Sequence, residues 1–281
     1  YVDGFAIYGL TEWYLATRDP DLLPPLQRTT DHVIHQLSRP HEEIPHFPYP
    51  IPAGSRAHGL PMIFSHCLGL LGHHLQDDRY IRSSQALSES IWSDFYRPSR
   101  DLIIERIGTD GKELPPPGGT AVVPGHVIED LWFQIELDKL SGKTDRSGKR
   151  CDLIRRHLEE GWDPEYGGIF LAIDADQQAA VDWGFADYKL WWPHTEALYA
   201  LLAAYEITGE SWCLEWYQRV FSYSMTHFFS QGHGEWIQRL TREGSPTDTV
   251  VALPVKDPFH LPRSILLQIE LLERLQSRNP R

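Results

Sequence analysis

The feature that most constrains the fold is a repeat of five apolar segments of helical length. Each segment runs for 14 or 15 residues and ends in a polar turn. Four of them carry a proline near the start, and successive prolines lie 63, 69 and 69 residues apart. Proline suits the first position of a helix, where its missing N–H costs nothing. The segments are residues 5–18, 61–75, 126–140, 194–208 and 262–275.

A second helical segment follows each of the first four, and the two types differ in polarity. The first type is apolar almost all round, as in residues 197–205, which indicates burial on every side. The second type is amphipathic, as in residues 149–158. A near-constant period with one helix pair per unit is typical of a helical array or a closed toroid. The second-type segments are residues 24–38, 77–96, 148–159 and 212–228.

These patterns predict an all-α protein with an inner ring of helices inside an outer ring, which is an (α/α) barrel. Five inner helices are visible and six is the usual closure, which leaves room for a first helix pair upstream of Tyr1. Residues 103–107 and 235–240 alternate and precede glycine turns, so we expect short β-hairpins over one mouth of the barrel. No linker or low-complexity tract appears, and residues 1–281 are expected to form a single catalytic domain.

Composition narrows the classes of partner. The formal charge is −13, from 39 acidic against 26 basic residues, and no basic stripe is present. Nucleic acid and membrane are therefore not expected as partners, and no apolar run approaches the roughly 18 residues of a bilayer span. Three widely spaced cysteines without a CxxC pattern favour free thiols in a cytoplasmic protein. Aromatic residues make up 12%, which suits either a packed core or a sugar-stacking pocket.

Histidines stand at the starts of four inner segments. If the inner helices run parallel, these imidazoles reach the same mouth, together with two carboxylates and an arginine. Helix spacing puts Glu129 on the face of His126, and Arg263 on the face of His260. A carboxylate beside an imidazole can orient it or hold a substrate hydroxyl. The alternative for any one of these histidines is capping or packing. The converging set is His58, His126, His194, His260, Glu129, Glu196 and Arg263.

Two other kinds of site are weak candidates. Neither HExxH nor HxH occurs, so no metal site is expected. Residues 108–112 lack the lysine-serine/threonine ending of a phosphate loop and are better explained as a hairpin turn. Trp132, Trp191 and Trp192 have two readings, as stacking partners for a sugar face or as ordinary core residues.

Six stretches, in this order along nearly the whole chain, resemble the N-acylglucosamine 2-epimerase family. They are residues 111–115, 124–129, 161–168, 189–197, 234–236 with 242–244, and 259–263. The resemblance implies an (α/α)6 barrel that interconverts C2 epimers of a sugar, of the N-acetylglucosamine/N-acetylmannosamine type. It implies His126 and His260 as the catalytic acid/base pair. Substrate-binding positions implied by the resemblance or by the convergence are Glu129, Trp132, Trp192, His194, Glu196 and Arg263.

The chain also departs from the family pattern. Family members carry an extra N-terminal helix pair with a substrate-binding arginine, and no residue before Tyr1 supplies it here. Met62 stands near a position where the cellobiose epimerase and isomerase branches usually have a histidine, which favours an epimerase. The resemblance leaves open ATP as an allosteric effector and a homodimer. No cofactor is required, and the expected ligand is a monosaccharide or a disaccharide.

The proposed chemistry needs two bases on opposite sides of C2 of the open-chain sugar, and histidine titrates in a suitable range. Arg263 and the helix N-termini would stabilise the enolate and lower the histidine pKa values, which keeps the rings neutral. A related aldose–ketose isomerase or a mannose or cellobiose 2-epimerase is the first alternative. Glycoside hydrolysis by Glu129 with Glu196 or Asp187 is a second alternative, and a non-enzymatic binding protein is a third.

Overall fold

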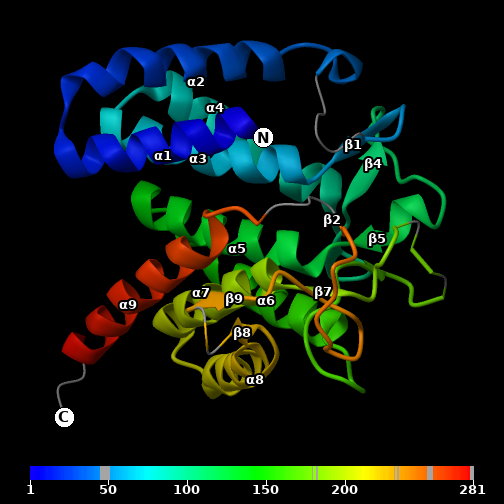
Figure 1. Ribbon diagram of the computed structural model, residues 1–281. Coiled ribbons are helices and arrows are strands. Elements are labelled where there is room, and N and C mark those ends of the chain that lie inside the picture. Colours follow the sequence, from blue (N-terminus) through cyan, green and yellow to red (C-terminus); the bar gives the residue numbers. More distant parts are fainter. Residues whose placement is uncertain are drawn as a thin grey trace.

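The computed structural model describes residues 1–44, 51–178, 180–181, 183–230, 232, 234–251 and 256–278. In these residues the five predicted inner helices are all present (Figure 1). They begin within a few residues of the predicted positions, because the proline-marked starts are helix starts. The inner helices are α1 (Val2–Thr17), α3 (Gly59–Leu75), α5 (Pro124–Ser141), α7 (Trp191–Thr208) and α9 (His260–Arg278).

Four outer helices alternate with them, as the second type of segment predicted. Each of the first four inner helices packs against the outer helix that follows it, and the inner helices neighbour one another in the order α1, α3, α5, α7, α9. The architecture is of the (α/α)6 barrel type, as expected. The outer helices are α2 (Leu23–Leu37), α4 (Asp78–Ser90, continued by a π-helical turn at Ile91–Phe95), α6 (Ser147–Gly161) and α8 (Ser211–His227).

Helix α7 shows why the inner segments lack a polar face. Its residues from Ala197 to Ala204 are all buried, since α5, α6, α8 and α9 surround it. Pro193 lies in its first turn, and Gly209 ends it with a left-handed φ of 67°. The outer helix α6 buries only one side and keeps charged side chains on the other.

The two helices that end the row of described inner helices differ from the rest. Helix α1 exposes Val2, Phe5 and Trp13, and α9 exposes a stripe that includes Leu266 and Ile269. Among the described residues α9 packs mainly against α7, and α1 mainly against α2 and α3. The starts of α1 and α9 also approach each other, since Phe5 and Tyr8 contact Phe259 and the Arg263 guanidinium lies over the Tyr8 ring. Apolar side chains elsewhere on both helices stay exposed.

Short antiparallel ladders connect the helices at one end, to the right in Figure 1 for most of them. The predicted hairpins differ in detail, because residues 103–107 and 235–240 each divide between two ladders with different partners. The pairs are β1 (Ser55–Ala57) with β4 (Arg106–Gly108), β2 (Tyr96–Arg97) with β3 (Leu102–Ile103), β5 (Ala121–Val122) with β6 (Ile173–Asp174), β7 (Lys189–Leu190) with β10 (Arg239–Leu240), and β8 (Phe229–Ser230) with β9 (Glu235–Trp236).

Single 3-10 turns occur at Pro20–Leu22, His41–Glu43 and Gly118–Thr120. Cys67, Cys151 and Cys213 are free and buried, in keeping with the predicted thiols. Among the helices of the described residues, none has the length and apolarity that crossing a bilayer requires.

Candidate active site

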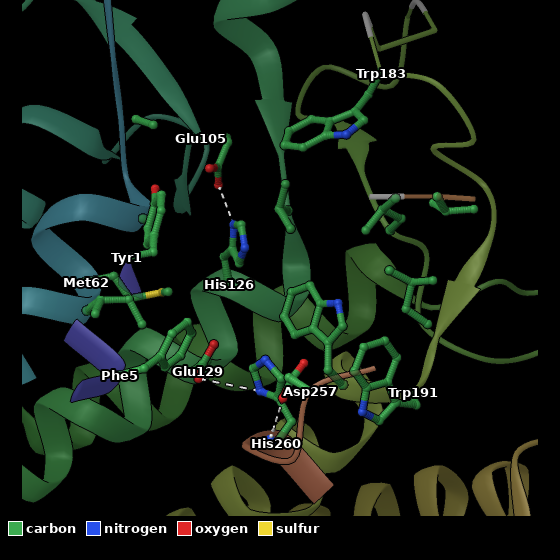
Figure 2. A pocket seen from close by; sticks show the side chains of 18 of the residues that line it. Tyr1, Phe5, Met62, Glu105, His126, Glu129, Trp183, Trp191, Asp257 and His260 are labelled. Atoms are coloured by element: carbon green, nitrogen blue, oxygen red, sulfur yellow. Dashed lines mark hydrogen bonds and ion pairs between the residues drawn. The ribbon is translucent and has the colours of Figure 1, made fainter. Parts of the chain in front are cut away.

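The ladders enclose a cavity of about 370 Å³ at the N-terminal ends of α5, α7 and α9. Four of the predicted site residues line it: His126, Glu129, Trp192 and His260. Figure 2 shows His126 and His260 at different levels of this one cavity, with Glu129 between them. The two histidines come from inner helices two repeats apart, so the parallel arrangement predicted from the proline-marked starts brings them together.

A buried carboxylate holds His126 from behind. Nδ1 of His126 lies 3.1 Å from Oε2 of Glu105, whose residue is only 4% exposed. Glu105 lies between β3 and β4, where its backbone N–H donates to the carbonyl of Ala121, just before α5. The ladder thus fixes the carboxylate beside the start of the helix that carries His126. A carboxylate in this position fixes the ring orientation and favours a proton on Nδ1.

His260 has the same kind of support from a different helix. Its Nδ1 lies 2.7 Å from Oε1 of Glu196 in α7 and 3.8 Å from Oε1 of Glu129 in α5. Asp257 accepts hydrogen bonds from the backbone N–H groups of Phe259 and His260, which caps the start of α9. The cap and the carboxylate together fix the ring at the cavity wall.

One indole lies against both imidazoles. The ring centroid of Trp192 is 5.1 Å from that of His126, with 29° between the planes, and 5.4 Å from that of His260, with 31° between the planes. Gly125 permits this arrangement, because a Cβ there would lie 2.7 Å from the Trp192 ring. Both catalytic candidates therefore share one aromatic neighbour on the wall of one cavity.

Arg263 lies behind this surface and joins its two carboxylates. Its Nη2 donates to Oε1 of Glu129 at 2.8 Å and to Oε1 of Glu196 at 2.7 Å. Burial and the charge of Glu196 raise the pKa of Glu129 above its ordinary value. Against the burial of Glu196, the charges of Arg263 and His260 lower the pKa of its carboxyl. The guanidinium is thus the cation that allows two acids to lie side by side.

Ligand atoms of Glu129, Glu196 and His260 lie within 4.8 Å of one another, which is a spacing that a metal ion could use. The Arg263 guanidinium already bonds both carboxylates at that point. An internal cation therefore already occupies Oε1 of both carboxylates. The structure favours a salt-bridged cluster over a metal centre at this position.

Several predicted site residues lie outside the cavity lining. Trp132 is 1% exposed and donates from Nε1 to Oε2 of Glu196 at 2.9 Å, so it supports a carboxylate. His194 is fully buried, and both of its ring nitrogens bond to backbone: Nε2 accepts from Ile169 and Nδ1 donates to Leu190. Glu196 and Arg263 reach the cavity only through their bonds to His260 and Glu129. Substrate contact by these four residues stays a prediction that this placement does not favour.

Two of the four histidines that were expected to converge do not reach the cavity. His58 is fully buried, with Nε2 2.9 Å from Oδ2 of Asp130. His58 and His194 are both held by fixed partners inside the protein. This is the packing role that the sequence analysis left open for each histidine. Only His126 and His260 of the four line the cavity.

The expected lowering of the two catalytic pKa values was wrong. Burial does lower the pKa of His126, but the charge and hydrogen bond of Glu105 outweigh it and leave the pKa raised. Burial also lowers the pKa of His260, and the charges of Glu129 and Glu196 reverse that effect. The carboxylate at hydrogen-bond distance decides the direction, because a helix N-terminus carries only about half a charge.

Asp163, Lys189 and Arg242 come from three of the stretches that carry the family resemblance, and they form a cluster of their own. Lys189 is fully buried and its Nζ lies 2.8 Å from Oδ2 of Asp163, which also accepts from Nε of Arg242 at 3.0 Å. Burial opposes ionisation, but the hydrogen bonds of Arg242 and Lys189 hold the pKa of Asp163 well below its usual range. This cluster fixes the start of α7 and does not line the cavity.

Sequence reasoning missed much of the cavity wall, including Glu105, Arg106, Trp183, Arg239 and Asp257. The detectable signal was a pair of charges, Glu105 and Arg106, inside the apolar run Leu102–Ile107. The hairpin strand predicted at residues 103–107 did not indicate where these two charges lie. Trp183 lies in an irregular connection, and no periodic pattern marks it.

Comparison with known proteins gives consistent results. The sequence model of the N-acylglucosamine 2-epimerase family matches residues 30–261. N-acylglucosamine 2-epimerase of Rattus norvegicus is 31% identical over 224 residues, which is 78% of this chain and 52% of the rat protein. The Homo sapiens protein of that name is 34% identical over 179 residues, or 63% of this chain and 41% of the human one. The chain therefore spans about half the length of these curated relatives.

The solved structure of cellobiose 2-epimerase from Bacillus thermoamylovorans superposes on the chain with a TM-score of 0.79. The alignment covers 95% of this chain and 70% of that one, at 18% sequence identity. At this identity the likeness shows a common fold.

Proposed function

The chain belongs to the N-acylglucosamine 2-epimerase family, and we propose that it is an isomerase that interconverts C2 epimers of a sugar. The observation that carries the proposal is the pair of imidazoles in one cavity, each hydrogen-bonded at Nδ1 to a carboxylate and each beside Trp192. The proposed substrate is an N-acetylhexosamine of the glucosamine/mannosamine type, in line with the names of the relatives. A cavity of about 370 Å³ lies in the size range of small-molecule sites.

In the proposed mechanism the sugar first opens to the aldehyde, which makes the C2 hydrogen acidic. One neutral imidazole removes the proton from C2 through Nε2. The electron pair of the C–H bond forms the C1–C2 double bond, and the carbonyl π electrons move to O1. The second imidazole, protonated, then donates its proton to the other face of C2 as the carbonyl re-forms. His126 and His260 exchange these roles in the reverse reaction.

The raised pKa values suit this division of labour. A two-base epimerase needs one neutral and one protonated histidine in the same cavity. Glu105 stabilises the protonated form of His126, and Glu129 and Glu196 stabilise that of His260. Both rings can thus carry a proton close to neutral pH and remain strong enough as bases when neutral. The proton transfer itself calls for neither a nicotinamide nor a metal.

Glycoside hydrolysis is the second candidate, because a pair of carboxylates is present. That reaction needs one carboxylic acid and one carboxylate that both reach the glycosidic bond. Arg263 holds both Glu129 and Glu196, and Glu196 is fully buried. Asp187 is exposed and lines a different groove. The carboxylates are therefore better placed to support histidines than to cleave a glycoside.

The proposal is tested by incubating the protein with N-acetylmannosamine in D2O and following the sugar by proton NMR. We expect N-acetylglucosamine to appear and the C2 proton signal to disappear from product. Conversion with the C2 hydrogen retained would contradict the mechanism. Binding of the sugar without conversion or exchange would favour the non-enzymatic alternative, and release of a sugar from a disaccharide would favour the hydrolase.

A further inference from the structure

The proposed reaction places negative charge on O1 of the enolate, and a cation beside O1 would stabilise that charge. The structure limits which side chains can supply the cation. Arg263, the candidate from the sequence, has its Nη2 between two carboxylates and does not line the cavity. Lys189 is buried against Asp163. Nε and Nη1 of Arg263 are buried without a hydrogen-bond partner, but neither Arg263 nor Lys189 lines the cavity.

Two arginines do line the cavity, Arg106 and Arg239. Arg239 already has an interaction partner of its own. Arg106 is half-buried, and among the described residues no carboxylate lies within ion-pair distance of its guanidinium. Glu105, its neighbour in sequence, bonds His126 instead. The charge of Arg106 acts on the Glu105 carboxylate without forming an ion pair with it. Arg106 is thus a half-buried guanidinium at the cavity wall with no ion pair among the described residues, which suits it to bind an anionic oxygen of a ligand.

The position of Arg106 is fixed from two sides. In the ladder of β1 and β4 it pairs with Ala57, which also lines the cavity. Its guanidinium carbon lies 4.9 Å from the ring centroid of Trp183, a cation–π contact that holds the planar group against an aromatic face. Figure 2 shows Trp183 at the same end of the cavity as Glu105 and His126, with His260 at the other end. Arg106 therefore belongs to the end of the cavity where His126 acts.

We propose that Arg106 binds O1 of the open-chain sugar and stabilises the enolate, with Trp183 as the platform that positions its guanidinium. This assignment rests on the proposed function. When the C2–H electron pair moves into the C1–C2 bond, the carbonyl electrons localise on O1. A guanidinium offers that oxygen a full charge and directed N–H donors. Preorganised donors of this kind act most strongly in the transition state.

The experiment compares Arg106→Gln, Arg106→Lys and Trp183→Phe by C2 hydrogen–deuterium exchange on N-acetylmannosamine, with kcat and KM determined separately. We expect Arg106→Gln to lower kcat by about 10²–10³-fold, the usual effect of removing one oxyanion donor, with a smaller change in KM. Arg106→Lys keeps a charge and should recover part of the rate. Trp183→Phe keeps an aromatic face and should stay closer to wild type than Arg106→Gln.

Arg56→Gln is the matched control. Arg56 lies in the same ladder, opposite Ile107, but pairs with Asp94 and does not line the cavity. The rate at which Arg56→Gln exchanges the C2 hydrogen should stay within about threefold of the wild-type rate. Equal circular dichroism and melting temperature for Arg56→Gln and Arg106→Gln would show that neither variant acts through misfolding.

Four results would overturn the assignment. In the first, kcat survives in Arg106→Gln while KM rises, which indicates uniform binding. In the second, Arg106→Gln loses affinity only for a 6-phosphorylated N-acetylhexosamine, used as an anionic probe, and turns over the neutral sugar normally. In the third, wild-type protein exchanges no C2 hydrogen, which overturns the proposed function and this assignment with it. Exchange in wild type and an unchanged Arg106→Gln would overturn the assignment alone.

Discussion

Nδ1 of His126 lies 3.1 Å from Oε2 of Glu105, and this pair repeats, on a different helix, the bond between His260 and Glu196. In both cases the carboxylate takes Nδ1, which leaves Nε2 for a substrate proton. Both carboxylates are buried, so each imidazole is positioned by a group that solvent does not screen. The two halves of the cavity thus present the same chemistry, an imidazole whose Nδ1 is hydrogen-bonded to a buried carboxylate.

Glu105→Gln should shift the pH dependence of kcat/KM. Glu105 raises the pKa of His126, so its removal lowers that pKa and shrinks the pH range in which the ring is protonated. The limb of the pH–rate profile that reports His126 should therefore move to lower pH, and kcat should fall as the ring loses its orientation. A pH–rate profile of C2 exchange measures both effects.

Glu113→Gln serves as the control for that profile. Glu113 pairs with Arg97 and Arg100 away from the cavity lining and is about half exposed. Its profile should overlie that of wild type. A Glu105→Gln profile with unchanged limbs would show that the carboxylate does not set the titration of His126.

Arg263→Met should destabilise the fold, because it leaves Glu129 and Glu196 buried beside each other without their cation. Removal of one partner from a buried ion pair typically costs roughly 3–5 kcal/mol. Urea unfolding at neutral pH measures the loss. Arg274→Met, on the same helix, should change stability by less than about 1 kcal/mol, because Arg274 is half-exposed and Glu206 keeps its ion pairs with Lys139 and Arg278. Equal stability losses in the two variants would contradict a buried role for Arg263.

Gly125→Ala should disturb the site while the helix survives. The added Cβ would lie 2.7 Å from the Trp192 ring and 2.9 Å from Cβ of Pro193, so the indole must move away from both imidazoles. We expect at least a tenfold loss of kcat/KM, since small misplacements at a reacting centre cost up to about a hundredfold. Gly148→Ala in α6, where a Cβ meets nothing within 4 Å, should keep full activity. Unchanged activity in Gly125→Ala would mean that the placement of Trp192 is not critical.

His194 should make the fold sensitive to acid. Burial lowers its pKa to about 3, whereas an unfolded histidine titrates near 6.5, so below pH 6.5 the unfolded chain binds a proton that the folded chain refuses. Stability is therefore lost as pH falls from about 6.5 towards 3. At pH 5 this one residue accounts for about 2 kcal/mol relative to pH 8. Urea unfolding of wild type at both pH values measures the difference.

His194→Gln removes that titration, so the stability difference between pH 8 and pH 5 should shrink by about 2 kcal/mol, although the variant is less stable at pH 8. His32→Gln, at an exposed position of α2, should leave the difference as in wild type. The burial account of His194 would be wrong if both variants kept the wild-type pH dependence.

The helical framework was predictable from the sequence because its signals are local. An apolar run recurs in all five inner segments and a proline-marked start in four of them. Helices α5 and α7, which also end at glycines, begin and end close to where these signals predict. The meeting of His126 with His260 followed from the parallel helices alone. Both residues lie in the first turn of their inner helices, so the architecture brings them to the same cavity.

The support of the site was less predictable, because it depends on irregular connections. Glu105 reaches His126 through a ladder whose partner strands are only two or three residues long. Trp183 comes from a connection without periodicity. The predicted direction of the histidine pKa shifts was wrong for the same reason. The neighbouring carboxylates raise the two pKa values by more than the helix N-termini lower them. His194 resembled His126 in sequence, but backbone partners in its own repeat bind both of its nitrogens.

The central claim is that His126 and His260 act on opposite faces of C2. Its most direct test is deuterium uptake at C2 from D2O in His126→Asn and His260→Asn, each offered N-acetylglucosamine and N-acetylmannosamine separately. Each variant should lose epimerisation by orders of magnitude and still exchange the C2 hydrogen of one epimer, and the favoured epimer should differ between the two variants. Exchange of both epimers at equal rates in either variant would contradict the two-base account.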